Sequence, residues 1–164
     1  MEKIETKRLL IRELELDDAK RMSEYRSKRE VAFYQSWWHY PYKKAIRRVE
    51  YCLKHPFNGR AGTYQLAVIL KENNEMIGDY YLEVNQPGSI TIGYTFDSVY
   101  WHQGYATESL TELLQVLKEQ YHFKLVLAHV YNDNHKSINL LKKFGFEKYD
   151  SSKILGDASF KLEL

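Results

Sequence analysis

Hydrophobic and polar residues follow two periods along the chain, and each period predicts one type of secondary structure. From position 63 to 70, apolar side chains occupy every second position, which is typical of a strand. Leu110, Leu113 and Leu117 recur at helical spacing, so an amphipathic helix that starts near Ala106 is expected. Read in the same way, the sequence predicts strands at 8–14, 63–70, 76–84, 89–96, 124–131, 146–150 and 158–164, and helices at 17–28, 41–55, 134–144 and from 106 onward.

The order of these elements is β-α-α-β-β-β-α-β-α-β-β, which predicts a mixed α/β fold with a sheet flanked by helices. The chain has 164 residues, of which 44% are hydrophobic and 28% are charged. These values are ordinary for a globular protein of one domain. We therefore expect a single domain that spans residues 1–164.

The turn between strand 89–96 and the following helix is the first candidate for chemistry. Gly104 and Ala106 keep the first helical turn free of bulk. The first N–H groups of a helix lack internal partners, and the helix dipole adds positive charge there. Such a terminus suits a phosphate or pyrophosphate. A plain strand-to-helix turn that needs small residues is the alternative interpretation of these two positions.

The neighbouring residues resemble a known family. Trp101-His102-Gln103-Gly104-Tyr105-Ala106-Thr107-Glu108 is similar to the pyrophosphate loop of the GCN5-related N-acetyltransferases, closest to the branch of ribosomal-protein N-terminal acetyltransferases. Two further blocks resemble the same family in the same order along the chain. They are Thr6-x-Arg8-Leu9-Leu10-Ile11-Arg12 near the start, and Asn134-x-x-Ser137 with Lys143-Phe144-Gly145-Phe146 near the end.

The resemblance implies a sheet that is mixed and mostly antiparallel. Its fourth and fifth strands, at 89–96 and 124–131, would be parallel and would splay apart into a V-shaped slot. A β-bulge near 94–96 would help to part them.

The resemblance also implies that acetyl-coenzyme A lies in this slot. The N–H groups of the loop would bind its pyrophosphate, and backbone groups of Phe96 and Ser98 would pair with its pantetheine arm as an added strand does. Lys143 is either a solvated helix end or a contact to the nucleotide phosphates. The expected cofactor-binding residues are Phe96, Ser98, Gln103, Gly104, Tyr105, Ala106, Thr107, Asn134, Ser137 and Lys143.

Two family positions with a catalytic side chain differ in this sequence. Many members carry a Tyr acid four residues after the Ser position, where this chain has Leu141, so Ser137 is the expected replacement; its alternative role is helix capping. A Glu often stands in the fourth strand, where this chain has Thr91. Asp157 is then a candidate general base. Glu83 is a candidate for binding the acceptor or for acting as the general base, although either residue could be a surface charge.

Aromatic side chains are dense in the stretch 29–40, which is expected to be irregular. Aromatics are favoured in ligand clefts, so Trp37, Trp38 and Tyr40 are predicted to wall the acceptor site. A place in the core or at a dimer surface is the alternative for these three residues.

The leading hypothesis is an N-acetyltransferase that transfers the acetyl group of acetyl-CoA directly to a primary amine in a ternary complex. No nucleophile for a covalent acetyl-enzyme stands out. The acceptor is a small molecule or a protein N-terminus. The alternative is a non-catalytic acyl-CoA-binding module, which the missing Tyr and Glu would suit.

Bulk properties narrow the partners and the location. A net charge of +2 gives no electrostatic footprint for nucleic acid. The chain has no apolar run of membrane-spanning length, and its single Cys52 suits a reducing cytoplasm. No residue is spaced to partner His102 as a metal ligand. We expect a cytoplasmic protein without a metal, as a monomer or a homodimer.

Overall fold

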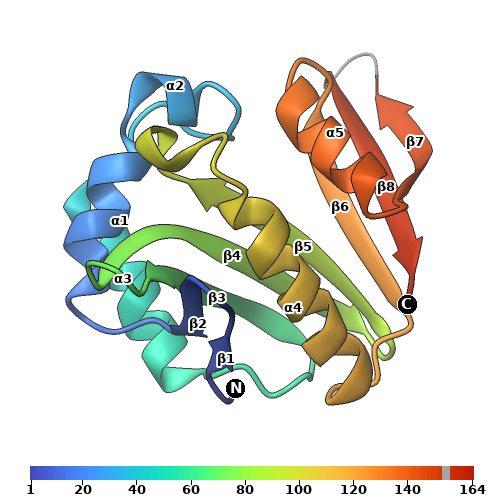
Figure 1. The fold of residues 1–164 in the computed structure, drawn as a ribbon, viewed down its shortest axis with the longest axis horizontal. Coiled ribbons are helices and arrows are strands. Elements are labelled where there is room, and N and C mark those ends of the chain that lie inside the picture. The colour runs from blue at the N-terminus through green and yellow to red at the C-terminus, as the bar shows by residue number, and fades with distance from the viewer. Residues whose placement is uncertain (153–155) are drawn as a thin grey trace.

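The computed structural model describes residues 1–152 and 156–164, and within them eight strands form one sheet in the order β1-β2-β3-β4-β5-β6-β8-β7 (Figure 1). The strands are β1 (Ile4–Glu5), β2 (Leu9–Glu13), β3 (Gly62–Leu70), β4 (Glu75–Gln86), β5 (Ser89–Phe96), β6 (Leu125–Tyr131), β7 (Glu147–Ser152) and β8 (Asp157–Glu163). The helices are α1 (Asp18–Arg26), α2 (Arg29–Ala32), α3 (Tyr42–Lys54), α4 (Tyr105–Glu119) and α5 (His135–Lys143), with a 3₁₀ turn η1 (Ser98–Tyr100).

Helices cover both faces of the sheet and bury β3 on its two sides. Leu66 and Val68 belong to the core that contains the leucines of α4, whereas Ala67 and Ile69 belong to the core formed with α1 and α3. The alternation in β3 therefore does not separate a buried face from a solvated face. Both sets of side chains are apolar because each faces a layer of helices.

The pairing of β5 with β6 confirms the splayed arrangement. These two strands are parallel and pair only from Ser89 with Leu125 to Ile92 with Ala128. β5 then continues to Phe96 and β6 to Tyr131 without pairing to each other. The other neighbouring strands pair antiparallel. In Figure 1 β5 and β6 separate towards the end of the molecule where α2 and α5 lie.

Several local expectations were wrong. The bulge expected near 94–96 is absent from the β4–β5 pair, which is regular from Gly78–Phe96 to Glu83–Thr91 and shifts register only between Glu83 and Gln86. The stretch 29–40 contains the short helix α2. The segment expected between the closing strands falls partly on residues 153–155, which lie outside the described residues.

A buried ion pair joins α1 to the sheet. Asp79 of β4 is fully buried, and its carboxylate accepts hydrogen bonds from Arg26 Nε at 2.9 Å and from Gln65 Nε2 at 2.5 Å. The Tyr25 hydroxyl donates to the same carboxylate. Burial and the neighbouring Asp79 raise the pKa of Tyr25 well above its ordinary value, so this phenol remains a donor. Because a buried charge without partners is costly, these contacts make the position of α1 specific.

Asp79→Ala is expected to lower the free energy of unfolding by about 3–5 kcal/mol, because it leaves the Arg26 guanidinium buried without its partner. Urea unfolding measures the change. The control is Glu5→Gln at the exposed Glu5–Lys71 pair, where a loss below about 1 kcal/mol is expected. Equal losses in the two variants would contradict the importance of the buried pair.

Candidate active site

The N-terminus of α4 has the geometry of an anion site. Gly104 has φ +81°, a left-handed conformation that side chains rarely adopt, and it occupies the N-cap position. The Glu108 N–H donates to the Gly104 carbonyl at 3.0 Å, so the N–H groups at positions 104–107 precede the first helical hydrogen bond. The positive end of the helix dipole adds to their attraction for an anion.

Arg8 and Glu108 hold this turn against the start of the sheet. Arg8 Nε lies 2.6 Å from Glu108 Oε2, and Arg8 Nη1 donates to the Gln103 carbonyl at 2.9 Å. The Arg8 guanidinium also lies 4.3 Å from the centre of the Tyr105 ring. The Thr6 hydroxyl donates to the second carboxylate oxygen of Glu108 at 2.5 Å. Residues about 100 positions apart in sequence thus fix the loop that precedes α4.

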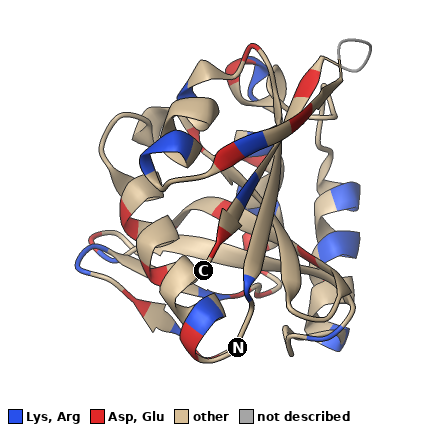
Figure 2. Ribbon diagram, turned by 90° about the vertical axis from the view of Figure 1, so that its right-hand side faces the viewer, with Lys and Arg blue, Asp and Glu red and all other residues tan. Residues whose placement is uncertain are grey.

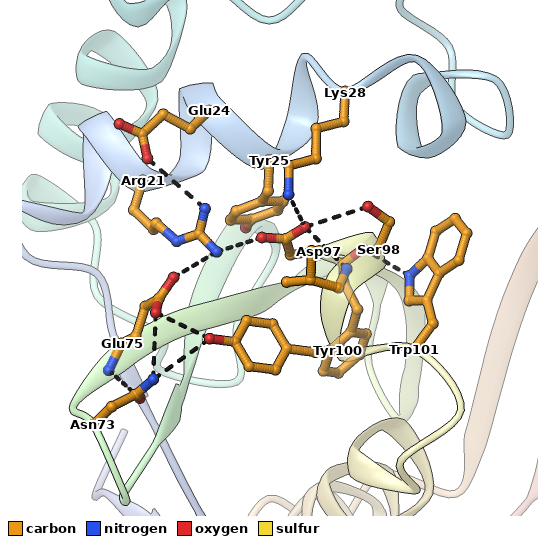
Figure 3. Close-up of polar contacts among 12 residues, drawn as sticks. Arg21, Glu24, Tyr25, Lys28, Asn73, Glu75, Asp97, Ser98, Tyr100 and Trp101 are labelled. Carbon is orange, nitrogen blue, oxygen red and sulfur yellow. Dashed lines mark hydrogen bonds and ion pairs between the residues drawn. The ribbon is translucent and has the colours of Figure 1, made fainter.

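A second network fixes the other end of this loop (Figure 3). The buried carboxylate of Asp97 accepts from Lys28 and Arg21 of the α1 region and from the Val99 N–H of η1. Burial would raise the pKa of Asp97, but the hydrogen bonds from the two cations lower it overall. Arg21 also pairs with Glu75 at 2.7 Å. The chain that leads from β5 into α4 is therefore tied to α1 and β4.

A first cavity of about 440 Å³ opens beside the N-termini of α4 and α5. It lies where β5 has separated from β6. Its lining includes Val31, Tyr34, Gln35, Tyr94, Thr95, Phe96, Tyr100, Trp101, His102, Gly104, Tyr105, Ala106, Thr107, Asn134, Lys136, Ser137, Asn139 and Leu140.

A second cavity of about 400 Å³ adjoins the first. Its lining is Tyr34, Gln35, Ser36, Ile92, Gly93, Tyr94, Ala128, His129, Val130, Tyr131, Asn134, Ser137 and Asp157. Tyr34, Gln35, Tyr94, Asn134 and Ser137 line both cavities. The two spaces therefore meet around these five residues.

Tyr94 and Ser137 form a hydroxyl pair at this junction. Their hydroxyl oxygens are 2.6 Å apart. Burial raises the pKa of Tyr94 to about 12, although the hydrogen bond with Ser137 opposes this rise. The Asn134 side chain accepts the Ser137 N–H at 3.2 Å and so caps α5. Since Asn134 supplies the cap, the Ser137 hydroxyl is available for its contact with Tyr94.

The structure brings most of the expected cofactor-binding residues to the first cavity. Those that line it are Phe96, Gly104, Tyr105, Ala106, Thr107, Asn134 and Ser137. Ser98, Gln103 and Lys143 line neither cavity. The Ser98 hydroxyl donates to Glu30, and the Gln103 amide donates to the Val99 carbonyl. The Phe96 carbonyl accepts a hydrogen bond from the Trp101 indole at 2.9 Å.

The expected acceptor residues are dispersed. Tyr40 is 5% exposed and Trp37 packs beside it in the core with α1 and α3, so these two residues take the core position instead of walling a groove. Trp38 is 81% exposed and lines neither cavity. Glu83 also lies outside both cavities and accepts from the Tyr81 hydroxyl at 3.1 Å. Asp157 lines the second cavity.

Sequence reasoning assigned no role to four residues of the candidate site. Arg8 clamps the loop, Tyr94 pairs with Ser137, and His129 lines the second cavity. The ammonium of Lys136 lies 4.4 Å from the centre of the Trp101 ring, at the wall of the first cavity. Only the alternation of side chains along β5 could have indicated the face on which Tyr94 lies. This pattern does not reveal which helix the phenol contacts.

The distribution of charged residues and of possible metal ligands does not change the description of the site. Figure 2 shows Lys and Arg interspersed with Asp and Glu along the ribbon. Among residues 1–152 and 156–164, no group of three or more His, Cys, Asp or Glu could hold a metal ion. Within the same described residues, no helix has both the length and the apolar character needed to cross a membrane.

Comparison with known proteins shows the family. Residues 8–147 match the model of the acetyltransferase (GNAT) domain, and the chain therefore belongs to the GNAT acetyltransferases. It is 28% identical over 151 residues to a Bacillus licheniformis protein described as the uncharacterized N-acetyltransferase p20, covering 90% of this chain and 84% of that protein.

Solved structures share the fold. A GNAT-family acetyltransferase from Bacillus anthracis superposes with a TM-score of 0.86 at 20% identity, over 98% of both chains. Mycobacterium smegmatis RimJ, solved in complex with CoA-disulfide, superposes with a TM-score of 0.84 at 17% identity, over 99% of this chain and 87% of that one. The expected fold, a mostly antiparallel sheet flanked by helices, is confirmed.

The clamp predicts how stability depends on pH. Partial burial would raise the pKa of Glu108, but hydrogen bonds from Thr6 and Arg8 lower it overall below its ordinary value of 4.5. A carboxylate with a lowered folded pKa stabilises the protein above its unfolded pKa and loses this effect as pH falls through the folded pKa.

Glu108→Gln is therefore expected to destabilise the protein by about 1–3 kcal/mol at pH 7, because charge-assisted hydrogen bonds are lost. The difference from the wild type should shrink as pH falls below 4.5. Denaturant unfolding at pH 7, 5 and 3.5 measures it. A difference that stayed constant over this range would contradict an ionised clamp.

Proposed function

We propose that this protein transfers the acetyl group of acetyl-CoA to a primary amine, directly and within a ternary complex. The observation that carries the proposal is the hydroxyl pair of Tyr94 and Ser137 at the junction of two cavities. One cavity suits the donor and the other suits the acceptor. A proton donor at their junction is positioned to serve a reaction between them.

The first cavity fits coenzyme A. The N–H groups at the start of α4 would hold the pyrophosphate, and the absence of a side chain at Gly104 allows close approach. The Lys136 ammonium adds positive charge at the cavity wall. When bound, acetyl-CoA supplies a thioester whose acetyl carbon an amine can attack. The role of these residues is to bind and orient the donor.

The Ser137 hydroxyl is the proton donor that we assign to the departing thiolate. Tyr94 keeps this hydroxyl in place, and its own pKa of about 12 keeps the phenol protonated at neutral pH. Leu141, at the family's Tyr position, is fully buried and belongs to the core. The phenol that would come from α5 is thus replaced by a serine of α5 supported by a phenol of β5.

The second cavity suits the acceptor amine. Asp157 contributes a carboxylate to its lining, and Tyr34, Tyr94 and Tyr131 contribute aromatic faces with polar tips. A protonated amine is attracted by a carboxylate and by aromatic faces. We assign to this cavity a primary amine on a partly apolar body, either a small molecule or the N-terminus of a protein.

Gly104→Val is expected to weaken the binding of coenzyme A by about tenfold or more. A Cβ at Gly104 would lie 3.4 Å from Arg8 Nη2 and would require a left-handed backbone for a β-branched residue, so the loop must shift. Calorimetric titration measures the affinity. Gly88→Val is the matched control: Gly88 has φ +77°, and a Cβ there meets no described atom within 4 Å. Unchanged affinity in Gly104→Val would remove the pyrophosphate assignment.

Ser137→Ala is expected to lower kcat by about 10²-fold, the scale of general acid catalysis, and to leave the dissociation constant of coenzyme A nearly unchanged. The cap of α5 comes from Asn134 and survives the substitution. Tyr94→Phe should lower kcat by a smaller factor, because it removes the support but keeps the serine. Steady-state rates and thermal melting separate these effects; normal turnover in both variants would refute the proton-donor role.

Release of free thiol in the presence of a panel of amines and short peptides tests the function itself. Turnover with at least one amine is expected. Coenzyme A binding without turnover for any amine would instead favour a non-catalytic acyl-CoA-binding module.

A further inference from the structure

The second cavity contains one imidazole, and a side chain of the neighbouring strand holds it. His129 of β6 lies directly opposite Ser159 of β8, and its Nδ1 is 2.9 Å from the Ser159 hydroxyl oxygen. Asp157 is two residues from Ser159 on β8, so it shares this face of the sheet. His129 and Asp157 both line the cavity, together with Tyr94 and Ser137 of the hydroxyl pair.

The contact with Ser159 engages one ring nitrogen of His129. When Nδ1 carries the hydrogen, the ring donates to Ser159 and its Nε2 keeps a free lone pair. Because a serine hydroxyl can donate or accept, the contact orients the ring and is compatible with either tautomer. In the tautomer with the hydrogen on Nδ1, Nε2 can accept a proton, and His129 lines the second cavity.

We propose that His129 is the general base of the acetyl transfer and that Ser159 is its positioning residue. This inference rests on the proposed function. A bound ammonium gives one proton to His129 Nε2, and the freed nitrogen lone pair forms the bond to the acetyl carbon. As the carbon–sulfur bond breaks, sulfur takes the hydroxyl proton of Ser137. The nitrogen then loses its second proton, which passes to the Ser137 oxygen and restores the Tyr94–Ser137 hydroxyl pair. The first proton remains on His129 and passes to solvent.

The surroundings of His129 suit this role. On β8, Asp157 and Lys161 share its face of the sheet, with Lys161 opposite Leu127. Tyr131 follows on β6, and Tyr94 of β5 and Tyr34 of the segment after α2 also line the cavity. Imidazole is the side chain whose titration suits proton transfer near neutral pH, which a carboxylate does less well. Asp157 is then assigned to attract the ammonium and to stabilise the imidazolium.

His129→Ala tests the proposal through rescue. We expect kcat/KM for the amine to fall by about 10²-fold, with the coenzyme A dissociation constant unchanged. Added imidazole should restore a large part of the rate, which no purely structural loss would allow. In the wild type, kcat/KM for the amine should fall at low pH, which is the acid limb of its pH profile. His129→Gln should lack this acid limb. Ser159→Ala should show a smaller loss and keep that limb.

His55→Gln is the matched control: His55 is exposed, follows α3, contacts the Tyr51 carbonyl through Nδ1 and lines neither cavity. It should retain the activity of the wild type. Asp157→Asn should raise the KM for the amine and keep the acid limb. The assignment is overturned if His129→Ala retains its rate, if imidazole restores nothing, or if Asp157→Asn is the variant that loses the acid limb. Failure of the proposed function looks different, because the wild type itself would then release no thiol with any amine.

Discussion

The separation of β5 from β6 after Ile92 and Ala128 is the constraint on which the candidate active site depends. Beyond this point two parallel strands no longer satisfy each other's N–H and C=O groups, and backbone polar groups need partners elsewhere. The helix that follows each strand begins near the opening, so the N-termini of α4 and α5 face the same space. The topology therefore brings the N-termini of two helices to one cavity, an arrangement that favours anionic ligands.

Such an opening must be held by side chains, because the sheet does not close it. The loop between β5 and α4 is tied at one end by Asp97, which accepts from two cations, and at the other by Arg8 and Glu108. These pairs are partly or fully buried, where an unpaired charge is costly, so each network favours a single arrangement. The positive φ of Gly104 persists within this support. Side-chain contacts from the α1 region and from the start of the sheet therefore hold the turn that precedes α4.

The sequence predicted what is local. The strand Ser89–Phe96 matches its expected bounds, and the helix expected near Ala106 begins at Tyr105, because periodicity and turn residues are properties of neighbouring positions. The helix α2 has four residues, too few to show a helical period. The bulge near 94–96 came from resemblance alone, and the splay arises instead where the β5–β6 pairing stops. The candidate site needed contacts that no local pattern contains: Arg8 meets Glu108 100 residues away, and Tyr94 meets Ser137 43 residues away.

The core also explains why Trp37 and Tyr40 do not wall an acceptor groove and how a leucine is accommodated at the family's Tyr position. Arg26 lies 4.5 Å from the ring centre of Trp37 and 4.7 Å from that of Tyr40, so the aromatics next to α2 serve the buried pair with Asp79. Leu141 of α5 likewise packs in the core that contains the leucines of α4. Because these positions are part of the core, the polar side chains near the opening come from the inner strands and from the first turn of α5. There the two cavities meet, and a phenol kept protonated by burial lies in contact with a serine hydroxyl. A substitution of either hydroxyl at this junction leaves the cap of α5 by Asn134 and the core position of Leu141 in place.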